Sequence, residues 1–319
     1  MIFTGLPTFL LLAISTVSSA VNAACVAYYD KKRHFFGYQK YLDMCVISLV
    51  VTLMSFVFGG FKFSASPFTV LLGMAFGVVV MINLLSMRLA YAVGPLALTT
   101  VVINFSTVFT SMSGAVLFGE KFNPLILIAL AFLISSSVFC SKSKKGESEK
   151  KANFKWLLFS VLAMLSCTGI GLMQKTHGTS EYKAEVIPFL MVAFLTCSVF
   201  SAIVAVTVRK IKRDEITAVT ESLQKTEKQL VFTKKPILLL VLYACLSGVF
   251  TSIEHSFNLY LSGVMPTAVF FPLVNGIPLV LSMVLGFTVL RQKLNKNQII
   301  GLILGVSGIT FVIVLTVIG

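Results

Sequence analysis

The chain has 319 residues, of which 57% are hydrophobic and only 12% are charged, and its mean hydropathy is +0.94. A soluble domain of this length does not need so much apolar surface, so the composition excludes an ordinary water-soluble protein. The net charge of +14 would suit a nucleic-acid-binding protein. The basic residues, however, gather between apolar runs, where membrane topology alone accounts for them, and we expect no nucleic-acid partner.

Apolar runs recur along the whole chain, and about 20 such residues are needed to cross roughly 30 Å of hydrocarbon. We find ten: Gly5–Tyr28, Met44–Gly59, Phe68–Ala92, Leu96–Phe118, Pro124–Cys140, Lys155–Gln174, Val186–Val208, Pro236–Ser262, Thr267–Leu290 and Gln298–Ile318. None shows the alternating pattern of a membrane β-strand, so helices satisfy the backbone best. The sequence predicts an all-α polytopic membrane protein with ten transmembrane helices.

Lysine and arginine are distributed unevenly between the segments that connect these runs. Of the 26 Lys and Arg residues, 22 follow odd-numbered runs, and only Lys62, Lys121, Lys175 and Lys183 follow even-numbered ones. Because Lys and Arg are enriched in cytoplasmic loops, the odd-numbered connections are expected in the cytoplasm. This predicts a protein of the cytoplasmic (inner or plasma) membrane with both termini outside.

The second half of the sequence resembles the first. Phe118–Asn123 (FGEKFN) and Leu290–Asn295 (LRQKLN) share the pattern x-Lys-apolar-Asn 172 residues apart. With one residue of slip, Gly77, Pro95 and Asn104 align with Gly248, Pro266 and Asn275. Five helices are an odd number, so the second copy must be inverted in the membrane. We expect a first repeat at 1–140, a basic cytoplasmic linker at 141–154, and a second repeat at 155–319 with a cytoplasmic loop at 209–235.

Phe271–Leu315 (FPLVNGIPLVLSMVLGFTVLRQKLNKNQIIGLILGVSGITFVIVL) and its weaker first-half copy resemble the ten-helix, EamA-like branch of the drug/metabolite transporter superfamily. In that family the fourth helix of each repeat commonly ends near an acidic residue and leads into a Gly-rich fifth helix. Glu120 and Lys121 fit this pattern, whereas Gln292 replaces the acid in the second half. The resemblance implies transport of metabolites, amino acids, drugs or nucleotide-linked compounds.

Polar side chains at helical spacing mark faces that should turn away from lipid. The clearest stripe contains Ser247, Thr251, Glu254, Asn258 and Ser262, and Asn83 aligns with Glu254 in the first repeat. Further inward-facing polar groups are expected at Ser15, Ser19, Asn22, Asn104, Gln174 and Asn275. We expect these stripes to border a central wet cavity.

Glu254 is the only carboxylate deep within an apolar run, about 13 Å along the helix from Gly263. An ionised carboxylate there costs at least about 2.5 kcal/mol, so it needs water, a partner or a proton. It is therefore a candidate proton or cation site, and the alternative is a protonated carboxyl group hydrogen-bonded to Asn83. His255 is its neighbour in sequence but lies about 100° round the helix, as a proton relay or as a packed hydrogen-bonding group.

Two other basic residues and one amide pair have open interpretations. Arg88 either snorkels to the cytoplasmic surface or recognises a carboxylate or phosphate at the inner mouth. Lys175 is expected to be interfacial. Asn104 and Asn275 are expected at similar depth on opposite sides of the cavity, with the breakers Pro272, Gly276 and Pro278 beside Asn275.

Taken together, these features predict a secondary transporter, with export as the expected direction, that moves a small solute by alternating access. The candidate substrate-binding or coupling residues are Asn22, Asn83, Arg88, Asn104, Gln174, Thr251, Glu254, His255, Asn258 and Asn275. The alternatives are an intramembrane enzyme acting on lipid or peptide, and a channel. The sequence has no HExxH motif, no phosphate-binding glycine loop and no paired cysteines. We thus expect no catalytic activity, cofactor or metal, and the partners to be a small-molecule substrate, the bilayer and a coupling proton, in a monomer or homodimer.

Overall fold

The structure is a computed structural model that describes residues 7–32, 39–121, 123–141, 153–211, 235–288 and 295–318. Within those ranges the chain forms ten α-helices and no β-strand, which confirms the all-α prediction. The helices are α1 (Thr8–Lys32), α2 (Gln39–Phe58), α3 (Pro67–Val93), α4 (Leu96–Leu117), α5 (Ile126–Ser141), α6 (Phe154–Thr179), α7 (Val186–Ile211), α9 (Lys235–Val264), α10 (Thr267–Thr288) and α11 (Lys296–Ile318). The predicted linker 141–154 and loop 209–235 lie largely outside the described residues, as does Gln292.

Seven of these helices are long and apolar enough to cross a membrane. Their spans are Tyr41–Phe58, Pro67–Tyr91, Leu98–Leu117, Phe154–Thr179, Val186–Lys210, Thr267–Leu285 and Lys296–Leu315, and shorter apolar stretches occupy Thr8–Ala23 and Ile126–Cys140. Large apolar side chains cover the outer faces, and Leu71, Ile203 and Ile303 are 65%, 55% and 60% exposed. Apolar surface on this scale is expected where helices face lipid. The chain is a multi-pass helical membrane protein.

Local sequence sets where several helices begin. Ser66 caps α3 by accepting a hydrogen bond from the Thr69 amide, with Pro67 in the first turn. Asn153 caps α6 by accepting from the Trp156 amide at 2.7 Å. Both caps satisfy an N–H group that the helix itself cannot pair.

Several helices extend farther than hydropathy predicts, and the second and sixth do so by five residues each at one end. The second begins at Gln39 instead of Met44, and α6 continues to Thr179 instead of ending at Gln174. Helical hydrogen bonding continues past the apolar stretch because polar side chains are tolerated where a helix meets water, so hydropathy marks the buried part of a helix and misses its ends.

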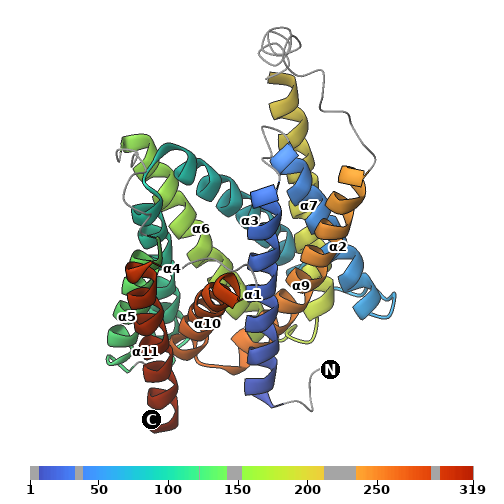
Figure 1. Ribbon diagram of the computed structural model, residues 1–319. Coiled ribbons are helices and arrows are strands. Elements are labelled where there is room, and N and C mark those ends of the chain that lie inside the picture. The colour runs from blue at the N-terminus through green and yellow to red at the C-terminus, as the bar shows by residue number, and fades with distance from the viewer. Residues whose placement is uncertain are drawn as a thin grey trace, which may run out of the picture.

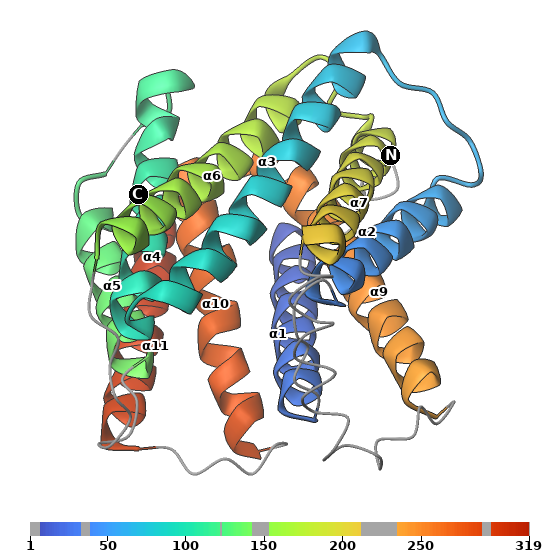
Figure 2. The same cartoon turned by 90° about the horizontal axis from the view of Figure 1, so that it is seen from above.

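The helices form one bundle in which α2 packs on α7, α5 on α11, and α4 on α10. Helix α3 packs on α6 and α7, while α9 packs on α1 and α2. Figure 1 shows α1 beginning and α11 ending at the bottom of the view, which we call the terminal end. Figure 2 shows α10 between α1 on one side and α4 and α11 on the other. Because successive helices alternate in direction, the connections after α2, α4, α6 and α9 also lie at the terminal end.

Most hydroxyl groups inside the bundle bond to the backbone of their own helix. The Thr16 hydroxyl donates to the Leu12 carbonyl at 2.9 Å, and the Thr110 hydroxyl donates to the Ser106 carbonyl at 2.9 Å. In lipid an unpaired polar group costs several kcal/mol, and this local bond removes the cost without a distant partner. The hydroxyls that instead reach another helix are therefore the informative ones.

The closest approach of α6 and α9 occurs between two glycines at the terminal end. A Cβ atom on Gly178 would lie 2.7 Å from the backbone nitrogen of Gly263, and a Cβ atom on Gly263 would collide with the Gly178 backbone. Small residues allow membrane helices to approach backbone to backbone and gain dispersion contacts. This contact fixes the separation of α6 and α9 where the connections after them begin.

We expect Gly178→Ala to destabilise the protein by about 2 kcal/mol, because the backbone atoms it would strike cannot yield as a side chain could. Thermal unfolding in detergent, followed through circular dichroism, measures this. Gly169→Ala on the same helix is the matched control, since its Cβ would meet only the Val79 side chain at 3.5 Å. Equal melting temperatures for the two variants would contradict the assignment of this contact.

Candidate functional site

The polar stripes of α1 and α9 face each other and form a seam through the bundle. The Ser15 hydroxyl donates to Asn258 Oδ1 at 2.6 Å, and Asn22 Nδ2 donates to Thr251 Oγ1 at 3.0 Å. The Ser247 hydroxyl in turn donates to Asn22 Oδ1 at 2.5 Å. The spacing of four and three residues on each antiparallel helix brings these groups into register. We call this set, with Ser19 and Glu254, the α1–α9 seam.

Glu254 lies in the middle of the seam. Its carboxyl group is half-buried and hydrogen-bonds to the Ser19 side chain. The neighbouring contacts of Ser15 and Asn22 lie one turn to either side on α1. The carboxyl group is thus surrounded by groups that can donate to a carboxylate or accept from a protonated acid.

His255 points away from the seam, as the helical angle predicts. Its ring centroid is 5.0 Å from that of Phe194 on α7 and 6.4 Å from that of Phe76 on α3. Nδ1 of His255 has no hydrogen-bond partner in the described part of the chain. These contacts are those of a packed side chain, and they do not connect it to Glu254.

Two predicted site residues lie on other helix pairs. Asn83 Nδ2 donates to the Ala163 carbonyl at 2.9 Å, which joins α3 to α6. Gln174 is buried, and its backbone carbonyl accepts from the Ser262 hydroxyl at 3.0 Å. The Asn83 amide therefore donates its hydrogen to the backbone of α6, whereas the Glu254 carboxyl group is bonded to Ser19 of α1.

Asn104 and Asn275 are brought together between α4, α5 and α10. Both line a small cavity of about 70 Å³, and Asn275 Nδ2 donates to Thr107 Oγ1 at 3.0 Å. Arg88 lies elsewhere, with its guanidinium carbon 5.8 Å from the centre of the Tyr41 ring, a cation–π contact between α3 and α2. The ten predicted residues thus divide among the seam, the small cavity, the Arg88–Tyr41 contact and three further helix interfaces, which are those of Asn83, Gln174 and His255.

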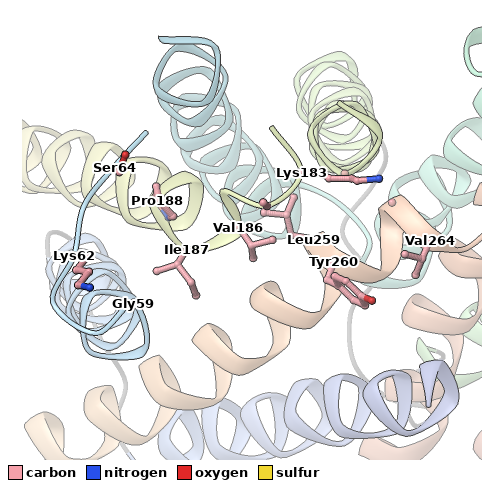
Figure 3. A pocket seen from close by; sticks show the side chains of 13 residues that line it. Gly59, Lys62, Ser64, Lys183, Val186, Ile187, Pro188, Leu259, Tyr260 and Val264 are labelled. Atoms are coloured by element: carbon pink, nitrogen blue, oxygen red, sulfur yellow. The ribbon is translucent and has the colours of Figure 1, made fainter. Parts of the chain in front are cut away.

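Two neighbouring cavities open at the terminal end, and both are lined by Gly263 and Val264. The larger has a volume of about 510 Å³ and lies between the end of α2, the start of α7 and the last turns of α9 (Figure 3). The second, of about 420 Å³, is lined by the α4–α5 connection, the end of α6 and the α9–α10 turn. The larger volume is in the range of small-molecule sites. We call these the α7 cavity and the Glu120 cavity.

A largely buried ion pair beside the Glu120 cavity joins helix α6 to the α4–α5 connection and the α9–α10 turn. Lys175 Nζ lies 2.6 Å from Glu120 Oε1 and donates to the Met265 carbonyl at 3.0 Å. The Thr267 amide and hydroxyl donate to Glu120 Oε2 at 2.7 and 2.5 Å. Lys175, which is expected to be interfacial, lies at the terminal end, but its side chain is only 4% exposed and is packed within the protein.

The partners of Glu120 stabilise its ionised form more than burial destabilises it. Burial alone would raise the pKa of Glu120, but the hydrogen bonds from Lys175 and Thr267 and the charge of Lys175 hold that pKa below its ordinary value. A carboxylate saturated in this way ties α4, α6 and α10 together at one point. Position 120 follows Gly119, whose φ of 65° turns the chain after α4.

A second carboxylate cluster lies beneath the α7 cavity. Glu185 Oε2 accepts from the Ser66 amide and the Ser66 hydroxyl, both at 2.9 Å. Burial alone would raise the pKa of Glu185, and the hydrogen bonds from Thr69 and Ser66 together lower it. Thr69 also lies 3.4 Å from Nε2 of the buried His177. Sequence reasoning missed both carboxylate clusters, because their members come from connections far apart in the chain.

No group of three or more His, Cys, Asp or Glu side chains that could hold a metal ion occurs in the part of the chain that the structure describes.

Lys175→Met should destabilise the protein by about 2 kcal/mol, since it leaves a largely buried carboxylate without its counter-charge. Thermal unfolding in detergent measures this loss.

The Glu120–Lys175 pair also predicts that the stability of the protein depends on pH. Because the folded pKa of Glu120 is lowered, its contribution is fully present above the ordinary carboxyl pKa and is lost as pH falls through the folded pKa. Melting temperature measured across the acid range should therefore fall less steeply in Glu120→Gln than in the wild type. The control is Glu181→Gln, which changes an exposed residue of the α6–α7 connection and should keep the wild-type slope. If the melting temperatures of Glu120→Gln and the wild type fell in parallel with pH, the ion pair would not contribute to stability.

Comparison with known proteins identifies a similar fold but no matching family. No family profile and no curated protein matches the chain. A solved structure, titled only as the crystal structure of a protein, aligns with 96% of this chain and 98% of its own, with a TM-score of 0.66 and 12% sequence identity. At that identity the likeness concerns the fold alone. The chain thus shares a complete architecture with a solved structure, from its first helix to its last.

Proposed function

We propose that this protein is a secondary transporter that moves a small solute across the membrane by alternating access, with export as the direction. The observation that carries the proposal is Glu254, an ionisable group of intermediate exposure that lies ten residues before the end of α9 and is bonded to Ser19 of α1. Carboxylates at such depth in a helical membrane protein are costly to keep, and they mark ion or substrate pathways. The resemblance to EamA-like drug/metabolite transporters, noted from the sequence, points the same way.

The α7 cavity lies on another face of α9 than this carboxylate. Its lining includes Leu259 and Tyr260, and Leu259 lies about 7 Å along the α9 axis from Glu254 but about 140° round the helix. Leu259 shares the helix face of His255, which turns toward α7 and α3. Coupling between the cavity and Glu254 would therefore act through a movement of α9 itself.

An inverted repeat of five helices, which we propose from the sequence, would permit alternating access. If α1 to α5 correspond in order to α6, α7, α9, α10 and α11, the contact of α3 with α7 maps onto that of α9 with α2, and the contact of α4 with α6 maps onto that of α10 with α1. The aligned glycines behave alike: a Cβ on Gly77 would press on Thr196 of α7, and one on Gly248 would press on Val50 of α2. Two halves related in this way can rock about a shared site.

The Glu120–Lys175 pair would then be part of the closure at the terminal end. The pair links the α4–α5 segment of the proposed first repeat to α6 and the α9–α10 turn of the proposed second repeat. A salt bridge between two halves that must separate is a contact with two discrete arrangements, formed and broken.

We further propose that the terminal end faces the outside of the cell or the periplasm. The Lys and Arg bias between the predicted runs supports this orientation. A reporter that is active only in the cytoplasm, fused after Gly319, should give no signal, whereas a reporter active only outside should. Strong cytoplasmic activity would reverse the orientation.

Coupling through Glu254 is tested in proteoliposomes. A solute identified by thermal-shift screening should show saturable uptake and counterflow, both driven by an imposed pH gradient. Glu254→Gln should keep counterflow and lose the response to the gradient, because the amide cannot exchange a proton. Ser256→Ala, whose parent hydroxyl bonds to the backbone of its own helix, is the control on α9. Gradient-driven uptake by Glu254→Gln at the wild-type rate would reject the coupling role.

A further inference from the structure

All four lysines that follow even-numbered predicted runs line the two cavities at the terminal end. Lys62 and Lys183 line the α7 cavity, and Lys121 and Lys175 line the Glu120 cavity. Lysine is depleted in loops on the outer side of the membrane, so the four lysines at the terminal end need a separate explanation. All four lie at two adjoining cavities, which suggests that they bind a ligand there.

Three of these lysines are not neutralised by the protein. Lys175 is paired with Glu120, but Lys62, Lys121 and Lys183 form no ion pair within the described ranges. Among the residues that line the two cavities Glu120 is the one acid, and neither Glu181 nor Glu185 lines either cavity. The walls therefore carry a net positive charge, which attracts anions into a concave, partly dehydrated space.

Backbone geometry holds one of these lysines at the cavity wall. Helix α2 ends in a Schellman motif, in which the Phe61 amide donates to the Phe56 carbonyl at 3.1 Å and the Gly60 amide donates to the Val57 carbonyl at 3.0 Å. The Phe56 and Phe61 rings pack edge to face at 5.4 Å. Phe61 itself has a φ of 60°, a conformation that costs about 1 kcal/mol for a residue other than glycine. This strained turn is followed directly by Lys62.

The lining combines charge with apolar surface. Figure 3 shows Lys62 and Ser64 on the segment after α2 and Lys183 on the connection before α7, with Val186, Ile187 and Leu259 between them. Lysines on separate segments around an apolar floor suit a molecule that has an anionic group and a less polar body.

We propose that the α7 cavity binds the anionic group, a carboxylate or a phosphate, of a small organic molecule, and that the transported solute is an organic anion. The assignment of solute class rests on the proposed transport function. Binding itself does not, because a purified protein that transports nothing could still bind the anion.

Succinate and inorganic phosphate, titrated into purified protein in a neutral detergent, are the probes. At least one should raise the melting temperature saturably, and the effect should weaken with added sodium chloride as the lysine charges are screened. Succinamide, the neutral diamide of succinate, should have no effect. Absence of saturable stabilisation by both anions, or an equal effect of succinamide, would overturn the proposal.

The double variant Lys62→Gln/Lys183→Gln should bind the active probe about tenfold more weakly, as expected for the loss of two partly exposed charge pairs. Lys155→Gln/Lys210→Gln removes two exposed lysines at the opposite end and should bind as the wild type does. Equal weakening in both double variants would show a general effect of net charge and overturn the site.

An anionic group could also belong to a lipid headgroup, and nanodiscs separate the two sources. Succinate binding should be the same in phosphatidylcholine nanodiscs and in those with added phosphatidylglycerol if the site serves a soluble anion. Competition by phosphatidylglycerol that disappears in Lys62→Gln/Lys183→Gln would assign the cavity to lipid and refute the solute class. Counterflow of a neutral solute, with no anion bound, would refute this inference and leave the transporter proposal standing.

Discussion

Lipid offers no hydrogen-bonding partner, and this constraint decides where every polar group of the bundle can lie. Most serine and threonine hydroxyls meet it within their own helix, as Thr16 and Thr110 do. Other hydroxyls reach across helices at several interfaces, as Ser48 does between α2 and α7 and Ser136 between α5 and α11. Between α1 and α9 such contacts form a continuous set, in which Asn22 bonds to both Thr251 and Ser247. A carboxylate can be kept at Glu254 because this seam surrounds it with groups of the right kind.

The terminal end obeys a different rule, since water is available there and charges are permitted. Its one ion pair within the described residues, Glu120 with Lys175, is nevertheless nearly enclosed and shared with Thr267. Burial strengthens the attraction between the two charges, but it also makes either charge energetically costly when its partner is absent. Such a contact is either made completely or not at all, as the proposed alternating access would require at a junction between its two halves.

Sequence periodicity predicted which faces carry polar groups, and it could not say which faces meet. The spacing of Ser15, Ser19 and Asn22 marks one side of α1 correctly, but their pairing with α9 depends on the order of helices in the bundle. Lys175 illustrates the limit most clearly. A single lysine at the end of an apolar run fits snorkelling to an interface as well as burial, and only a carboxylate from another connection decides between them. The α7 and Glu120 cavities could not be predicted from the sequence for the same reason, because the residues that line them come from connections distant in sequence.

The proposed repeat shares its backbone contacts more closely than its chemistry. Gly77 and Gly248 allow equivalent helix approaches in the two halves, whereas the aligned pair Asn83 and Glu254 have different partners, a backbone carbonyl of α6 for one and a hydroxyl of α1 for the other. Rocking of two halves requires only that their helices pack alike. In the proposed transporter, coupling to an ion would require an ionisable group in one half alone, because the two halves would move together. The proposed repeat could therefore keep its glycines in pairs while a single carboxylate supplied the coupling.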